Sequence, residues 1–314
     1  MVQKYIINPN YDINSIILII QEFISIHSKT VVIITGPTGS GKTNISHKLY
    51  SSFNSMLISA DSRQIYKDVN IGSNKPRVVN CCLVDSFYTA FIEDNKEIFK
   101  YWNLDELNLS VDFSAQKFRQ KMRRIQNILQ SQDILPIIVG GSVHWLRSLI
   151  SENISPYYES DIKIYSSLKE KSLLDLQNTY ISVYEKNNLN DSDWNNSRRL
   201  MRAIEFKQIT KESLYVSTMK HSDEYNYLVF ETEIDRTNHR DKIRQSVTQR
   251  LDLGWINEVQ LINKKYNNKF IFDKLGLGYM IISEIIDKNS VYNIDELIEK
   301  ITIAEMRYTK KQKL

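Results

Sequence analysis

The stretch Gly36–Thr43, GPTGSGKT, has the residue types needed to bind a polyphosphate. It matches the pattern G-x-x-x-x-G-K-[ST], in which backbone N–H groups and the N-terminus of a following helix surround phosphate oxygens. Lys42 would place a positive charge at the outer oxygens, and the hydroxyl of Thr43 would hold Mg²⁺. The predicted diphosphate- or triphosphate-binding residues are Gly36, Pro37, Thr38, Gly39, Ser40, Gly41, Lys42 and Thr43.

A carboxylate follows this loop at the end of an apolar run, where Asp61 begins the stretch DSRQIY. Asp61 could hold Mg²⁺ through water, as a strand-end aspartate often does in P-loop NTPases. It could also act as a base, or its side chain could cap the following turn. The residue types alone leave all three roles open.

The segments that must position these residues alternate between two patterns. Buried, β-branched runs predict strands, and amphipathic runs predict helices between them. This alternation predicts an α/β fold with a P-loop NTPase-like parallel sheet core flanked by helices. Strands are expected over residues 30–35, 56–61, 134–141 and 227–235, and helices over about 42–53 and 114–132.

The chain changes character after about residue 150. Residues 151–225 are polar, rich in tyrosine and helix-prone, with no convincing buried strand. We therefore expect a catalytic core made of residues 1–150 and 226–314, interrupted by a helical insertion domain over 151–225. In the insertion, Arg198 and Arg202 share one helical face beside Arg199. Such a run is as compatible with a solvated basic helix as with anion binding.

Composition places few further limits on function. The 314 residues carry a net charge of +4, which permits nucleic-acid contact without requiring it. The two cysteines, Cys81 and Cys82, are adjacent, so neither a disulfide framework nor a zinc site is indicated. The apolar run at 13–20 is too short for a membrane span and lacks the features of a signal peptide. We expect a soluble, cytoplasmic protein without membrane contact.

Taken in order, the motifs resemble those of the tRNA dimethylallyltransferase family. The resemblance runs from about residue 30 to the last residues of the chain. After the phosphate-binding loop come DSRQIY at 61–66, GSNKP at 72–76, PIIVGGS at 136–142, RLMRAIE at 199–205, LGLGYMIISE at 275–284 and MRYTKKQ at 306–312. The chain departs from the family pattern at NCCLVD (80–85), which lacks two usual histidines, and at GGSVHWL (140–146).

This resemblance implies transfer of a dimethylallyl group from dimethylallyl diphosphate to the N6 amine of the adenosine 3′-adjacent to the anticodon in tRNAs. Negative charge develops on the leaving diphosphate, so the reaction needs cations and N–H donors there. The loop, Mg²⁺ and Arg202 would supply them, and Asp61 would accept the amine proton. The expected catalytic residues are therefore Asp61, Thr43 and Arg202.

The resemblance also implies contacts to a tRNA anticodon stem-loop by a protein that we expect to be monomeric. Gln64 could bind an adenine edge, because its amide has both a donor and an acceptor. The expected tRNA-binding residues are Asp61, Ser62, Arg63, Gln64, Ser142, Arg198, Arg199 and Arg202.

Two other functions stay open at this point. A P-loop kinase of a small nucleoside or metabolite would use the same loop, with Asp61 near the acceptor hydroxyl. A relative that binds RNA without catalysis would retain affinity and form no product. The tyrosine-rich insertion and the arginines at 198–202 favour a large polyanion over a small acceptor.

Overall fold

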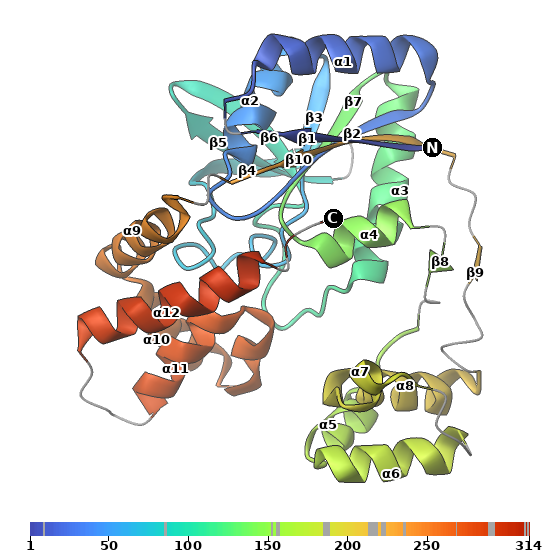
Figure 1. The fold of residues 1–314 in the computed structure, drawn as a ribbon, viewed down its shortest axis with the longest axis vertical. Coiled ribbons are helices and arrows are strands. Elements are labelled where there is room, and N and C mark those ends of the chain that lie inside the picture. Colours follow the sequence, from blue (N-terminus) through green and yellow to red (C-terminus); the bar gives the residue numbers. More distant parts are fainter. Residues whose placement is uncertain are drawn as a thin grey trace. The chain divides into compact units, whose positions relative to one another are not determined.

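A computed structural model of the chain has a central sheet with the strand order β1-β10-β2-β7-β3-β6-β5-β4 (Figure 1). It describes residues 1–8, 10–84, 87–151, 153–154, 158–184, 189–212, 219–220, 224–234, 237–267, 269–287, 293–310, 312 and 314. The strands are β1 (Val2–Ile7), β2 (Thr30–Thr35), β3 (Ser55–Ser59), β4 (Val78–Val84), β5 (Phe87–Asp94), β6 (Glu97–Trp102), β7 (Leu135–Val139) and β10 (Asn226–Thr232).

Alternate side chains of the sheet enter two separate apolar cores. Val32 and Ile34 of β2 pack on the face covered by α1 (Ile13–Ile26) and α2 (Lys42–Ser52). Val31 and Ile33 enter the core on the other face. That second core also contains side chains of α3 (Ala115–Ser131), α4 (Val143–Ile150), α9 (His239–Asp252), α10 (Trp255–Tyr266), η1 (Lys269–Lys274), α11 (Leu277–Asp287) and α12 (Ile294–Thr309).

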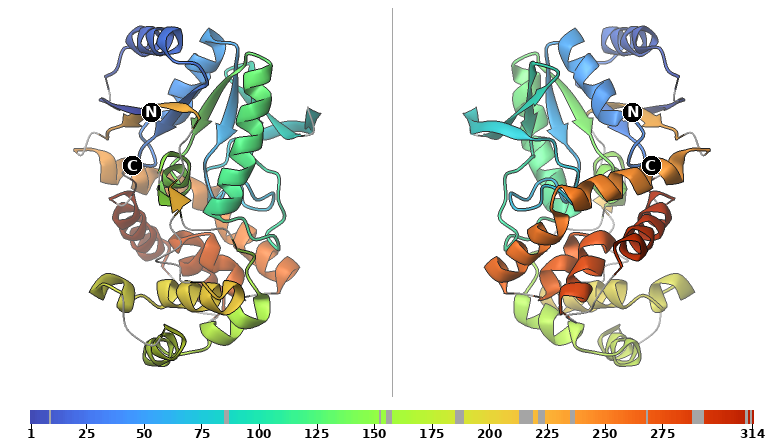
Figure 2. Two further views of the ribbon diagram at one scale, coloured as in Figure 1. Left: turned by 90° about the vertical axis from the view of Figure 1, so that its right-hand side faces the viewer. Right: turned by 90° about the vertical axis from the view of Figure 1, so that its left-hand side faces the viewer.

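The predicted α/β fold is confirmed, with every predicted strand and helix present near its expected bounds. The apolar side of α3 is buried as its periodicity indicates. The sheet is not wholly parallel, because β5 runs antiparallel to both β4 and β6. In the side views, β4 and β5 extend away from the other strands (Figure 2).

The sequence patterns did not predict β1, β4, β5 or β6. Most residues of β1 and β4 are exposed, because both strands lie at edges of the sheet. An edge strand needs no continuous apolar run, so its sequence lacks the signal of a buried strand.

The chain divides into two compact units, residues 1–150 with 224–314, and residues 151–223. The second unit contains α5 (Ile162–Lys169), α6 (Leu173–Tyr184), α7 (Asp191–Trp194) and α8 (Ser197–Thr210), with the two-residue strands β8 (Asn153–Ile154) and β9 (Met219–Lys220). It has its own core, which includes Leu176, Tyr180, Leu200 and Ile204. In the part of the chain that the structure describes, no helix is long and apolar enough to cross a membrane.

Candidate active site

The phosphate-binding loop leaves the buried strand β2 through a tight turn at Gly36. The backbone of Gly36 has φ +140°, a value that strongly favours glycine. A Cβ atom at this position would also lie 2.2 Å from Oγ1 of Thr232, at the end of β10. Gly39 and Gly41 have positive φ as well, and Gly41 directly precedes α2. The sequence pattern therefore corresponds to a loop that only glycine at these positions can form without strain.

Lys42 folds back onto its own loop. Its Nζ donates a hydrogen bond of 2.6 Å to the carbonyl of Pro37. Burial lowers the pKa of Lys42 to about 8, and the negative charge of Asp61 partly offsets this effect. A buried ammonium group with a depressed pKa gains from an anion placed beside it. Lys42 is thus suited to bind the diphosphate that the loop is predicted to hold.

Thr43, in the first turn of α2, is exposed. Its hydroxyl makes no hydrogen bond within the described residues. Those residues contain no cluster of three His, Cys, Asp or Glu side chains that could hold a metal. A P-loop Mg²⁺ does not need such a cluster, because it binds a hydroxyl together with phosphate oxygens and water. The residues present therefore fit Mg²⁺ bound with a diphosphate.

Asp61 caps the turn that follows β3. Its Oδ1 accepts hydrogen bonds from the backbone N–H groups of Arg63 (2.9 Å) and Gln64 (3.3 Å). Its Oδ2 has no hydrogen-bond partner among the described residues. One oxygen therefore fixes the orientation of the carboxylate, and the other remains available to bind or accept a proton.

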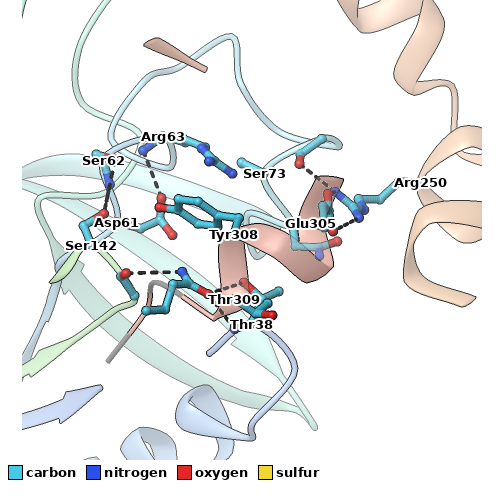
Figure 3. A pocket seen from close by; sticks show the side chains of 14 residues that line it. Thr38, Asp61, Ser62, Arg63, Ser73, Ser142, Arg250, Glu305, Tyr308 and Thr309 are labelled. Carbon is cyan, nitrogen blue, oxygen red and sulfur yellow. Dashed lines mark hydrogen bonds and ion pairs between the residues drawn. The ribbon is translucent and has the colours of Figure 1, made fainter. Parts of the chain in front are cut away.

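Asp61 lines a pocket together with the 72–74 loop, the loop after β7 and the end of α12 (Figure 3). The hydroxyl of Ser142 accepts the N–H of Ser62 (2.9 Å) and thereby joins two of these segments. The guanidinium of Arg63 lies 4.9 Å from the ring centroid of Tyr308, and in the described part of the chain it forms no ion pair. The lining residues are Thr38, Asp61, Ser62, Arg63, Gly72, Ser73, Asn74, Gly141, Ser142, Arg250, Glu305, Tyr308, Thr309 and Gln312.

The side chain of Gln64 binds the 72–74 loop, which lines this pocket. Its Nε2 donates to the carbonyls of Ser73 (3.0 Å) and Asn74 (3.2 Å). The donor part of the amide is therefore already engaged, and binding of an adenine edge by Gln64 stays a prediction. Lys75 is also structural, since its Nζ binds Asp105 and the carbonyl of Tyr66, and burial lowers its pKa.

Two charged residues of the C-terminal helices form hydrogen bonds with the backbone of residues 70–72. Glu258 of α10 accepts the backbone N–H groups of Asn70, Ile71 and Gly72 at 2.8–3.1 Å. Arg250 of α9 donates to the carbonyl of Gly72 (3.0 Å) and to both carboxylate oxygens of Glu305 (2.8 Å each). No sequence pattern indicated these residues, because a single buried charge on a helix forms no local pattern.

The C-terminal motif MRYTKKQ contributes a second side chain that the sequence left without a role. Gln312 accepts the N–H of Thr38 (3.2 Å) and donates to the carbonyl of Gly141 (3.2 Å). The end of the chain thus contacts the phosphate-binding loop directly.

The three predicted arginines lie on α8, in the second unit. Arg199 forms an ion pair with Asp193, and the guanidinium of Arg202 lies 5.9 Å from the ring centroid of Tyr158. Arg198 is exposed and makes no ion pair within the described residues. The roles of these arginines at the diphosphate and on tRNA stay predictions.

The family model described as IPP transferase matches residues 64–313, so the phosphate-binding loop and Asp61 precede the matched range. The tRNA dimethylallyltransferase of Acetivibrio thermocellus is 30% identical over 291 residues, covering 90% of this chain and 87% of that protein.

Two solved structures share the fold. The tRNA isopentenylpyrophosphate transferase of Bacillus halodurans superposes with a TM-score of 0.60 at 22% identity, covering 91% of this chain and 86% of that one. A eukaryotic dimethylallyltransferase that acts on tRNA has a TM-score of 0.68 at 19% identity, covering 91% and 69%. The family match extends over most of the chain, and the Acetivibrio enzyme aligns with nearly all of it. The chain therefore belongs to the IPP transferase family, together with the tRNA dimethylallyltransferases.

Proposed function

We propose that this protein transfers a dimethylallyl group from dimethylallyl diphosphate to the exocyclic N6 amine of the adenosine 3′-adjacent to the anticodon in tRNAs. Membership of the family supports this reaction and does not support the alternative of a small-molecule kinase. The observation that carries the proposal is the carboxylate of Asp61. It lines a pocket bounded in part by the phosphate-binding loop, with one oxygen held and one free.

The proposed step breaks the allylic C–O bond, and the bonding electrons leave with the diphosphate. The lone pair of N6 forms the new N–C bond, and the amine proton passes to Oδ2 of Asp61. Lys42 and the N–H groups of the loop would stabilise the charge on the leaving diphosphate. When bound, Mg²⁺ would neutralise further charge on the diphosphate, and the Thr43 hydroxyl would be one of its ligands.

The acceptor would be a nucleotide of an anticodon stem-loop that is turned out of its stack, which costs a few kcal/mol. Ser62, Arg63, Gln64 and Ser142 lie at or beside the pocket and would contact it. Arg198, Arg199 and Arg202 would bind the polyanion, with Arg202 also at the diphosphate. A helical insertion that contacts tRNA, a monomeric state and a cytoplasmic location belong to the same proposal.

The test supplies the purified chain with an anticodon stem-loop and either labelled dimethylallyl diphosphate or ATP. We expect label on the stem-loop and release of diphosphate with the allylic donor alone. A stem-loop with guanosine in place of the target adenosine is the matched control and should remain unlabelled. Acceptor-dependent formation of ADP without prenyl transfer would instead support a kinase. Stem-loop binding without product from any allylic diphosphate would indicate an RNA-binding protein without catalysis.

A further inference from the structure

We propose that Gln312 is a positioning residue for the diphosphate, acting through the backbone of Thr38 in the phosphate-binding loop. The proposed function enters only in naming dimethylallyl diphosphate as the ligand. The proposed role of Gln312 in binding a diphosphate depends only on the phosphate-binding loop.

The amide of Gln312 joins the two loops that follow the neighbouring strands β2 and β7. Its Oε1 accepts the N–H of Thr38, and its Nε2 donates to the carbonyl of Gly141, each at 3.2 Å. Only 5% of Gln312 is exposed, so these bonds are shielded from water. The two partners are a donor and an acceptor, and the amide satisfies both at once, because its oxygen accepts and its NH₂ group donates.

Gln312 is itself fixed in place by its surroundings. Its backbone N–H donates to the carbonyl of Thr309 at the end of α12 (3.1 Å). A Cβ atom at Gly141 would lie 2.8 Å from Nε2 of Gln312, so this glycine leaves the space that the amide occupies. The side chain therefore has one defined position between the two loops.

Thr38 also lies close enough to α9 to affect a side chain of that helix. His239, in the first turn of that helix, is buried, and burial lowers the pKa of its imidazole, an effect that the backbone of Thr38 partly offsets. Of these two residues, Gln312 binds the backbone N–H of Thr38 in the diphosphate loop directly. A loop whose N–H groups are fixed before binding loses less entropy and less reorganisation energy when the anion arrives.

Replacement by glutamate tests this role, because Gln312→Glu keeps the shape of the side chain. The carboxylate can still accept the N–H of Thr38, but it cannot donate to Gly141 and it adds a negative charge beside the anion site. We expect the Kd for inorganic pyrophosphate and the KM for dimethylallyl diphosphate to rise about tenfold, the effect of one hydrogen bond of about 1.4 kcal/mol. The KM for the stem-loop should stay near the wild-type value.

Gln312→Ala is the second variant, since it removes both bonds without adding charge, and it should raise the same two constants. Gln130→Glu, at an exposed position of α3, is the matched control and should change neither. If Gln312 has only a structural role, its variants would melt at lower temperature but bind pyrophosphate as the wild type does. That result would overturn the inference and leave the proposed function intact. If the wild type bound pyrophosphate but transferred no prenyl group, the proposed function would fail, and the pyrophosphate comparison would still decide the role of Gln312.

Discussion

Glu258 and Gly72 lie 186 residues apart in the sequence and are joined by a hydrogen bond of 3.1 Å from the Gly72 N–H to the carboxylate. The same carboxylate accepts the N–H groups of Asn70 and Ile71 and the hydroxyl of Tyr279. Helix α10 therefore holds a loop that lines the pocket beside Asp61. The site depends on the C-terminal helices for its shape, although its phosphate-binding loop and Asp61 lie near the start of the chain.

Replacing Glu258 by glutamine should lower the free energy of unfolding by about 2–3 kcal/mol, because hydrogen bonds to a charged acceptor are lost. Each carboxylate oxygen of Glu258 accepts at least one backbone N–H. In either orientation, the NH₂ group of the glutamine would therefore face a backbone N–H donor. Urea denaturation measures the change. Tyr279→Phe removes only one donor to the same carboxylate and should cost about 1 kcal/mol. Wild-type stability of Glu258→Gln would show that the carboxylate does not hold the loop.

Gly72 should tolerate no larger residue while Trp255 is present. A Cβ atom at Gly72 would lie 2.0 Å from Nε1 of Trp255, so Gly72→Ala should destabilise the protein by about 1–3 kcal/mol or more. Trp255→Phe shortens the opposing side chain and should relieve part of this overlap. The double variant should then lose less stability than the sum of the two single variants, by about 0.5 kcal/mol or more. Simple additivity in the denaturation curves would contradict this contact.

The dependence of kcat/KM on pH should show the pKa of Lys42. Burial lowers its pKa to about 8 in the free protein, so Lys42 is charged below this pH and becomes neutral as the pH rises through it. The neutral amine binds diphosphate more weakly, and kcat/KM for dimethylallyl diphosphate should therefore fall above about pH 8. The Lys42→Arg variant stays charged throughout this pH range. Its kcat/KM should therefore not fall in the same way, whatever the overall activity of the variant. A wild-type profile that stays flat until the ordinary range of lysine would exclude the depressed pKa.

Sequence patterns predicted the parts of the molecule that depend on near neighbours. The glycines at 36, 39 and 41 need unusual backbone angles within one loop, and Phe118 and Met122 of α3 follow the helical period, so both features are visible locally. The capping bonds of Asp61 are local as well and were among the three roles that its sequence position left open.

Glu258, Arg250 and Gln312 could not be found in this way, because each acts on a backbone group far away in the sequence. Arg63 is a related case. It was predicted only as a tRNA contact, and its position over the ring of Tyr308 depends on how α12 packs. The roles of β4, β5 and β6 in the sheet likewise depend on strand pairing and not on an apolar run.

The arginines of α8 should differ in their contribution to stem-loop binding. Arg198 is exposed, whereas Arg199 is paired with Asp193. If Arg198 contacts a phosphate, Arg198→Ala should reduce the slope of log K against log salt by about 1. Arg199→Ala should have a smaller effect, because its charge is already compensated. Lys96→Ala, an exposed turn position between β5 and β6, is the control. Equal salt slopes for Arg198→Ala and the wild type would remove Arg198 from the interface.

The Asp61→Asn variant in a single-turnover assay shows whether Asp61 is the base of the prenyl transfer. The amide oxygen can still accept the N–H groups of Arg63 and Gln64, so the turn is kept while the proton acceptor is lost. The assay is run below pH 8, where Lys42 remains charged. We predict that transfer to the stem-loop slows about a hundredfold or more while inorganic pyrophosphate still binds. Transfer at the wild-type rate would show that Asp61 is not the base.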